Sequence, residues 1–103
     1  MHSRSETRTY VGRLEAGAQA VYVVDPAGVG RLTPPGAGFG WGVDAVGNAM
    51  ELARTLLADA TGREPGSEAS ERFVAQILSR LPHDGFTLQR DTVGAWMRRT
   101  VSV

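Results

Sequence analysis

The spacing of the apolar residues changes partway along the chain, and this change limits the fold to a mixed one. Residues 9–13 and 19–24 are rich in Tyr and Val, the side chains that suit a pleated, partly buried strand. From residue 48 onward, apolar side chains recur at steps of three and four, which indicates amphipathic helices. Strands followed mainly by helices predict an α+β domain rather than a doubly wound α/β domain.

The two Tyr/Val-rich segments predict an N-terminal antiparallel hairpin. Residues 14–18 would form its loop, in which Gly17 can adopt the positive φ that a short turn requires. Pro26 ends the second strand, because proline lacks the N–H that a strand ladder needs. Residues 27–38 are rich in glycine and proline, so we expect a loop there, with at most a short extended piece at residues 31–32.

The strongest helix prediction covers residues 48–60, where leucines and alanines form one continuous stripe. Asn48 and Glu51 have the spacing of a capping box at its start. Gly62 is placed to end the helix as a C-terminal cap.

Two further helices and a short strand are expected after it. Ser67 or Ser70 caps one helix, which Pro82 closes, and residues 86–88 form a brief strand or an extended lead. Asp91 caps the last helix, in which Gly94 is less favourable than alanine by about 1 kcal/mol. The predicted fold is therefore the hairpin and short extra strands packed against about three helices.

Large apolar residues alternate with glycine just before the strongest helix, at Phe39, Trp41 and Val43. In an extended chain they point to one face and leave the other face bare. Such a bare face accepts either a neighbouring backbone or a ligand. We favour core packing, because buried aromatic residues belong to the core far more often than to a site.

Length and composition restrict the class of protein. A chain of 103 residues forms one compact domain, which we place at residues 9–103 behind a flexible tail at residues 1–8. The chain has no cysteine, which excludes disulfides, thiol catalysis and thiolate metal sites. Its 11 basic and 11 acidic side chains cancel, so the domain lacks the overall positive field of non-specific nucleic-acid binders.

We expect a cytoplasmic protein that does not enter membranes. The first ten residues are polar and lack the apolar core of a secretory signal. The longest purely apolar run covers residues 20–24, far fewer than the roughly 18 residues that a membrane helix needs.

The sequence predicts no catalytic residue, no metal ligand and no cofactor. It contains no Walker motif, nucleophile elbow or His-Glu-x-x-His stretch, and the glycines at residues 36–42 fall at every second position instead of the dinucleotide-binding spacing. The two histidines, His2 and His83, lie in the tail and in an expected solvent-exposed turn. They therefore form no ligand cluster.

The start of the strongest helix is a candidate anion site. Residues 46–50 follow glycine-rich backbone, and a helix N-terminus presents unpaired amides and a positive dipole end. Arg13 or Arg31 would supply a bidentate partner, whereas Asp44 brings a negative charge to the same place. The candidate ligand-binding residues are Arg13, Arg31, Trp41, Gly42, Asp44, Gly47 and Asn48.

Three functions are compatible with these patterns. The first is a non-enzymatic protein-interaction or ligand-binding domain, with a protein partner or self-association through the edge of the short hairpin. The second is a small anion- or nucleotide-binding domain that uses residues 42–50. The third is a nucleic-acid-associated protein with arginines near both ends, which the zero net charge disfavours.

The pattern also resembles a known family. The residues that carry the resemblance are Tyr10-Val11-Gly12-Arg13, Phe39-Gly40-Trp41-Gly42, the Ala/Leu helix at residues 49–59 and Gly85-Phe86-Thr87-Leu88. Together they resemble a small family of bacterial and phage domains of unknown function over residues 9–99. The resemblance implies the fold outline and implies no activity.

Overall fold

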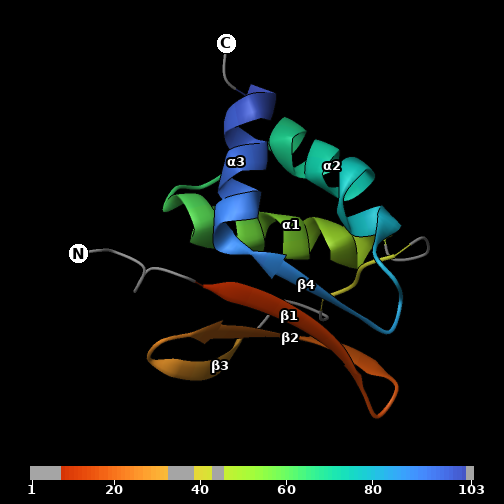
Figure 1. Cartoon of the computed structure of the whole chain (residues 1–103). Helices are drawn as coiled ribbons and strands as arrows, with labels where there is room; N and C mark the ends of the chain where they lie inside the picture. Colours follow the sequence, from red (N-terminus) through yellow and green to blue (C-terminus); the bar gives the residue numbers. More distant parts are fainter. Residues whose placement is uncertain (1–7, 33–38, 43–45, 102–103) are drawn as a thin grey trace.

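The computed structural model describes residues 8–32, 39–42 and 46–101. Its elements in chain order are β1 (Thr9–Glu15), β2 (Ala18–Asp25), β3 (Gly28–Leu32), α1 (Val46–Thr61), α2 (Ser67–Gln76), the short 3-10 helix η2 (Leu78–Arg80), β4 (Gly85–Gln89) and α3 (Arg90–Val101). The four strands form one antiparallel sheet in the order β3-β2-β1-β4. The helices lie on one side of this sheet (Figure 1), which confirms the α+β prediction.

The β1–β2 hairpin has a tighter turn than expected. Glu15 pairs with Ala18, so that only Ala16 and Gly17 form the loop. Their φ values are 51° and 83°, and two successive positive φ angles are the mark of the type I′ turn that matches strand twist. The positive φ predicted for Gly17 is confirmed.

The predicted loop is wrong at residues 28–30, and the short extended piece expected at residues 31–32 is confirmed as part of a longer strand. Gly28–Leu32 forms the edge strand β3, and Val23 pairs with Gly30 in its register with β2. Pro26 and Ala27 form a two-residue turn, and Gly28 leaves it with a φ of 137°. The tight turn places the segment beside β2, where backbone pairing outweighs the low strand propensity of glycine.

The core lies between the sheet and the helices. Tyr10, Val21 and Val23 point from the sheet toward the buried leucines of α1. Two edge-to-face aromatic pairs belong to the core: Trp41 with Phe86 at 4.8 Å, and Phe73 of α2 with Trp96 of α3 at 4.9 Å, between ring centroids. The buried core residues are Tyr10, Val21, Val23, Phe39, Trp41, Ala49, Leu52, Ala53, Leu56, Leu57, Phe73, Leu78, Phe86, Val93 and Trp96.

The segment before α1 belongs to the core, although it is not a strand. Trp41 is only 1% exposed, and its Nε1 donates a hydrogen bond to the carbonyl oxygen of Pro82 at 2.8 Å. Gly42 has a φ of 97°, and its N–H donates to the carbonyl oxygen of Leu78 at 2.8 Å. Core packing at Trp41 is confirmed, and Val43 lies outside the described residues.

The stripe of α1 is buried as predicted, but the helix start is not where the cap was expected. The helix begins at Val46, so Asn48 lies in its first turn instead of at the N-cap. At the other end, Gly62 has a φ of 77° and donates its N–H to the carbonyl oxygen of Ala58 at 2.8 Å, which confirms the C-terminal cap.

The start and the end of α2 also differ from the prediction. Its N-cap is Gly66, without a side-chain cap bond. Ser67 is the first helical residue, and the buried Ser70 donates its hydroxyl to the carbonyl oxygen of Gly66 at 3.1 Å. The helix ends at Gln76, before η2, instead of continuing to Pro82.

The last helix starts directly after β4, which confirms the brief strand predicted at residues 86–88. The prediction that Asp91 caps this helix is wrong, because Asp91 lies in the first turn of α3. The N–H of Arg90 donates instead to the carbonyl oxygen of Arg8, at 2.8 Å. A backbone acceptor from outside the helix thus satisfies one of the four N–H groups that have no partner within the helix at its start.

Candidate functional site

The residues predicted for an anion site lie on both sides of the sheet. Side chains alternate along a strand, and Tyr10, Val21 and Val23 mark the side that faces the helices. Arg13 and Arg31 therefore lie on the opposite side, where both are exposed. The structure does not bring these two arginines to the start of α1.

The other predicted residues lie on the helix side or outside the described part of the chain. Trp41 and Gly42 are buried, and Gly47 and Asn48 belong to the first turn of α1, where Asn48 is exposed. Asp44 lies outside the described residues. His83 lies in an exposed turn, as predicted, and its carbonyl oxygen accepts a hydrogen bond from Gln19 Nε2 at 2.9 Å.

The side of the sheet away from the helices is a candidate interaction surface. No described element covers it (Figure 1). Val24 and Val29 pair with each other across β2 and β3, and their exposed fractions are 38% and 70%. We call the surface formed by Val24, Val29 and Arg31 the open-face patch.

The neighbours of this patch are fixed by contacts within the sheet. Tyr22 donates its hydroxyl to the carboxylate oxygens of Glu15 at 2.7 and 2.8 Å. That hydrogen bond raises the pKa of Tyr22. The guanidinium carbon of Arg31 lies 5.9 Å from the centre of the Tyr22 ring, a cation–π distance that orients the arginine along the sheet.

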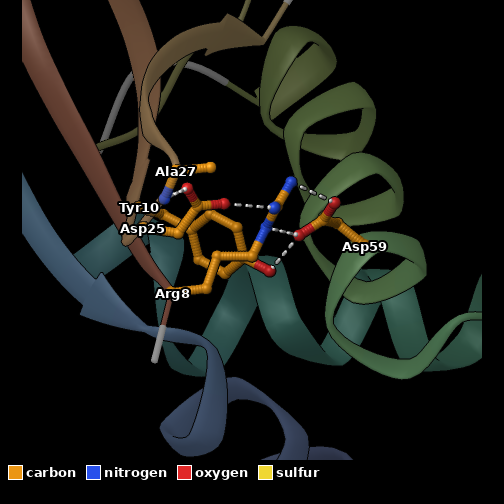
Figure 2. Close-up of polar contacts among 5 residues, drawn as sticks. All are labelled: Arg8, Tyr10, Asp25, Ala27 and Asp59. Carbon is orange, nitrogen blue, oxygen red and sulfur yellow. Dashed lines mark hydrogen bonds and ion pairs between the residues drawn. The ribbon is translucent and has the colours of Figure 1, made fainter. Parts of the chain in front are cut away.

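A half-buried polar cluster connects this sheet to α1 (Figure 2). Arg8 donates two hydrogen bonds to Asp59, from Nε to Oδ2 at 2.8 Å and from Nη2 to Oδ1 at 3.0 Å. Its Nη1 donates to Asp25 Oδ2 at 2.9 Å, and the hydroxyl of Tyr10 donates to Asp59 Oδ2 at 2.5 Å. One arginine therefore bridges the end of β2 and helix α1.

The same cluster reaches the turn that begins β3. The second oxygen of Asp25, Oδ1, accepts a hydrogen bond from the N–H of Ala27 at 2.9 Å, which is an Asx-type turn contact. Arg8 thus holds the carboxylate that shapes the β2–β3 turn (Figure 2). Because these contacts reach the turn from which β3 begins, we call Arg8, Tyr10, Asp25 and Asp59 the β3 anchor.

The electrostatics of the β3 anchor suit a structural role better than proton transfer. Burial and the hydrogen bond to Asp59 raise the pKa of Tyr10 well above its usual value. The hydrogen bond to Asp59 also raises the pKa of Arg8. The phenol and the guanidinium both stay protonated as donors, whereas a catalytic base near neutral pH needs a pKa close to the working pH.

A groove opens elsewhere, between α3 and the junction of α1 with α2. Its volume is about 680 Å³. The hydroxyl of Thr61 in its wall donates to the carbonyl oxygen of Leu57 at 2.7 Å and is not free to act as a nucleophile. The lining residues are Ala60, Thr61, Arg63, Glu64, Pro65, Gly66, Glu68, Ala69, Gly94, Met97 and Arg98.

Sequence reasoning did not identify the β3 anchor or the groove. Arg8 and Asp59 are 51 positions apart, and no periodic pattern connects two such residues. Gly94 was the one available signal for the groove, because glycine is unfavourable inside a helix.

The described part of the chain contains no helix long and apolar enough to cross a membrane.

Comparison with known proteins identifies the family without a function. The chain matches none of the curated proteins and none of the solved structures. A model of a family of unknown function, DUF6166, matches residues 10–99, which include all four strands in whole or in part and all three helices up to residue 99. The chain belongs to this family of unknown function, DUF6166.

Proposed function

We propose that this domain is a non-enzymatic protein-interaction module that binds an extended segment of a partner along β3. The observation that carries the proposal is the exposure of Val29, 70%, on an edge strand. Edge strands present unpaired backbone groups, and binding by strand addition uses these groups for affinity. Neighbouring apolar side chains then select the partner.

The composition of β3 favours such an approach. Gly28 and Gly30 have no side chain, and a Cβ atom added at either position would meet nothing within 4 Å. The edge therefore presents open backbone between Val29 and Arg31. Lysine, proline and bulges, by which many proteins protect an edge, do not occur within these five residues.

The β3 anchor supports the proposal by fixing the strand before a partner arrives. Arg8 connects Asp25, at the start of the β2–β3 turn, to Asp59 on α1. A strand held in place loses less conformational freedom on binding than a free one. The polar residues next to the patch are engaged with each other, as in the Tyr22–Glu15 contact, which favours recognition over chemistry.

The experiment that tests this function compares Val29→Lys with Leu14→Lys. Leu14 is 40% exposed at the far end of β1, so its replacement makes the same chemical change away from the β3 edge. Each full-length variant is used to capture proteins from a source lysate, and each is examined by size-exclusion chromatography with light scattering. We expect the wild type and Leu14→Lys to retain the same stoichiometric partner, and Val29→Lys to retain at most a tenth as much, about 1.4 kcal/mol weaker.

Two results would refute the proposal. One is retention of the partner by Val29→Lys at the wild-type level. The other is a wild-type protein that stays monomeric and retains nothing. Concentration-dependent dimerisation that Val29→Lys abolishes would identify the partner as a second copy of the chain.

The proposal includes a cytoplasmic location in bacterial cells or in cells infected by phage. A chain without cysteine has no thiol that depends on the redox state of its compartment. The location is tested by fractionation of a source cell with an antibody against the domain.

A further inference from the structure

Gly94 lies in the middle of α3 at a position where the fold itself does not require glycine. Its backbone is not among the positive-φ positions of the described residues. A Cβ atom at this position would meet only the Nη1 atom of Arg98, at 3.7 Å, which is an ordinary contact distance. Glycine weakens a helix relative to alanine, so a position without a steric need for it calls for another explanation.

The groove between α3 and the α1–α2 junction supplies that explanation. Gly94 contributes to its lining, and a side chain at this position would contact the guanidinium of Arg98. The volume of about 680 Å³ falls within the range of roughly 300 to 1,000 Å³ that is typical of small-molecule sites. Ala60, Ala69 and Met97 give the groove an apolar wall.

The charges at the groove indicate the class of ligand. Arg63 lines the groove from the connection between α1 and α2, and Arg98 lines it from α3. Within the described residues neither forms an ion pair. Glu68, also in the lining, is paired with Arg72 at 3.2 Å. A guanidinium binds a carboxylate with two parallel hydrogen bonds, which makes arginine suited to that group.

The acidic residues of the lining limit the charge of the ligand. Glu64 and Glu68 both contribute to the groove, and a polyanion such as a nucleotide would be repelled by them. A single negative charge placed between Arg63 and Arg98 avoids most of this repulsion. An apolar body attached to that charge would contact Ala60, Ala69 and Met97.

We propose that this groove binds a small organic carboxylate with an apolar body, its carboxylate on Arg98 and Arg63 and its body over Gly94 and Met97. This site is separate from the β3 edge and does not depend on the proposed protein-interaction function. None of the lining residues comes from the sheet.

The test is a titration of the full chain with octanoate, in which binding is measured by calorimetry and by amide chemical shifts. Acetate tests the carboxylate without the body, octanol the body without the charge, and octylamine the body with the opposite charge. We expect octanoate to bind at millimolar concentration or tighter, with shifts at Ala69, Gly94 and Met97. Each of the three comparison compounds is expected to bind at least about tenfold more weakly. Octanol and octylamine lose the hydrogen bonds between the carboxylate and the arginines, and acetate loses the burial of the apolar body.

Two pairs of variants complete the test. Arg98→Ala is expected to weaken octanoate binding about tenfold. Arg99→Ala is the control: it changes the neighbouring exposed arginine, which does not line the groove, and it is expected to leave the affinity for octanoate unchanged. Gly94→Ala is expected to weaken octanoate binding while raising the melting temperature, and Ala95→Gly on the same helix to lower the melting temperature without a loss of affinity.

The combination of tighter folding and weaker binding in Gly94→Ala separates a ligand role from a purely structural one. The proposal is wrong if octylamine binds as well as octanoate, if Arg99→Ala weakens binding as much as Arg98→Ala, or if octanoate at 10 mM shifts no groove amide.

Discussion

The β3 anchor yields a prediction that geometry makes quantitative. In Asp59→Ala, Arg8 loses two hydrogen bonds and the hydroxyl of Tyr10 loses its acceptor. Hydrogen bonds to a charged group contribute about 1.5 to 3 kcal/mol, and a buried hydroxyl without a partner costs about 1 to 3 kcal/mol. Both side chains of the ion pair are about a quarter to a third exposed, so screening by solvent reduces the first contribution.

We therefore expect Asp59→Ala to lower the free energy of unfolding by about 2 to 4 kcal/mol. Tyr10→Phe alone is expected to lower it by about 1 kcal/mol, because Asp59 keeps Arg8 as its partner. In the double variant no hydroxyl is left unsatisfied. Its loss of stability is thus predicted to be smaller than the sum of the two single losses, by about 1 to 2 kcal/mol.

This double-mutant cycle is measured by urea denaturation of the wild type, the two single variants and the double variant. The fluorescence of the two tryptophans reports the unfolding. Glu51→Ala is the control, since its 3.8 Å contact with Arg54 is a single exposed ion pair and its loss is expected to change stability by less than about 0.5 kcal/mol. Additive effects of Asp59→Ala and Tyr10→Phe would refute the reasoning, because independent effects mean that the hydroxyl does not depend on Asp59.

Three further predictions concern stability. Burial and the hydrogen bond to Asp59 raise the pKa of Tyr10 in the folded protein above its ordinary value of 10.0. The neutral phenol therefore stabilises the fold fully below pH 10, and this stabilisation is lost as the pH rises further. Urea midpoints measured from pH 8 to 11 should fall for the wild type and fall less for Tyr10→Phe. Gly12→Ala places a Cβ atom in steric clash with the ring of Phe86 and is expected to lower stability by about 1 to 3 kcal/mol. Gly30→Ala meets nothing within 4 Å and should change stability by less than about 1 kcal/mol; equal urea midpoints for the two variants would contradict this assignment. Gly94→Ala is expected to stabilise α3 by about 1 kcal/mol, or roughly 4 to 8 °C in melting temperature by calorimetry, and a lower melting temperature would show that the glycine serves the packing after all.

The parts of the fold that were predicted correctly depend on local periodicity. The stripe of α1 buries Leu52, Leu56 and Leu57 as its spacing indicated, because one face of a helix is fixed by sequence alone. The strands β1 and β2 follow in the same way from their Tyr and Val residues. Gly17 and Gly62 were found because a turn and a helix end both need a positive φ that glycine adopts readily.

The errors occurred where a distant segment determines the structure. The strand β3 exists because β2 lies beside it, and the glycines of its own sequence indicate a loop. At the start of α3 the N–H of Arg90 donates to the carbonyl oxygen of Arg8, from a segment more than 80 residues earlier, and the helix begins at Arg90, so that Asp91 lies inside it. Helix caps inferred from Ser, Asn or Asp identify the region of a helix start, and backbone contacts from elsewhere then fix the residue.

The candidate sites were harder to predict than the fold, for the same reason. The predicted anion site combined residues that are near in sequence with arginines that the strand alternation places on the other side of the sheet. The groove brings together residues 60–69 and 94–98, and the β3 anchor joins Arg8 to Asp59. Only Gly94 marked one of these places in advance, through a helix position at which glycine is unfavourable.

The two proposed sites divide the molecule in a way that makes each independently testable. The open-face patch depends on β2 and β3, and the groove depends on α3 and the α1–α2 junction. The β3 anchor reaches α1 at Asp59, next to Ala60 in the groove wall. A change at Asp59 therefore acts on both regions, whereas Val29→Lys and Arg98→Ala each act on one. Loss of partner binding in Val29→Lys with unchanged octanoate affinity, and the reverse in Arg98→Ala, is the pattern that two separate sites require.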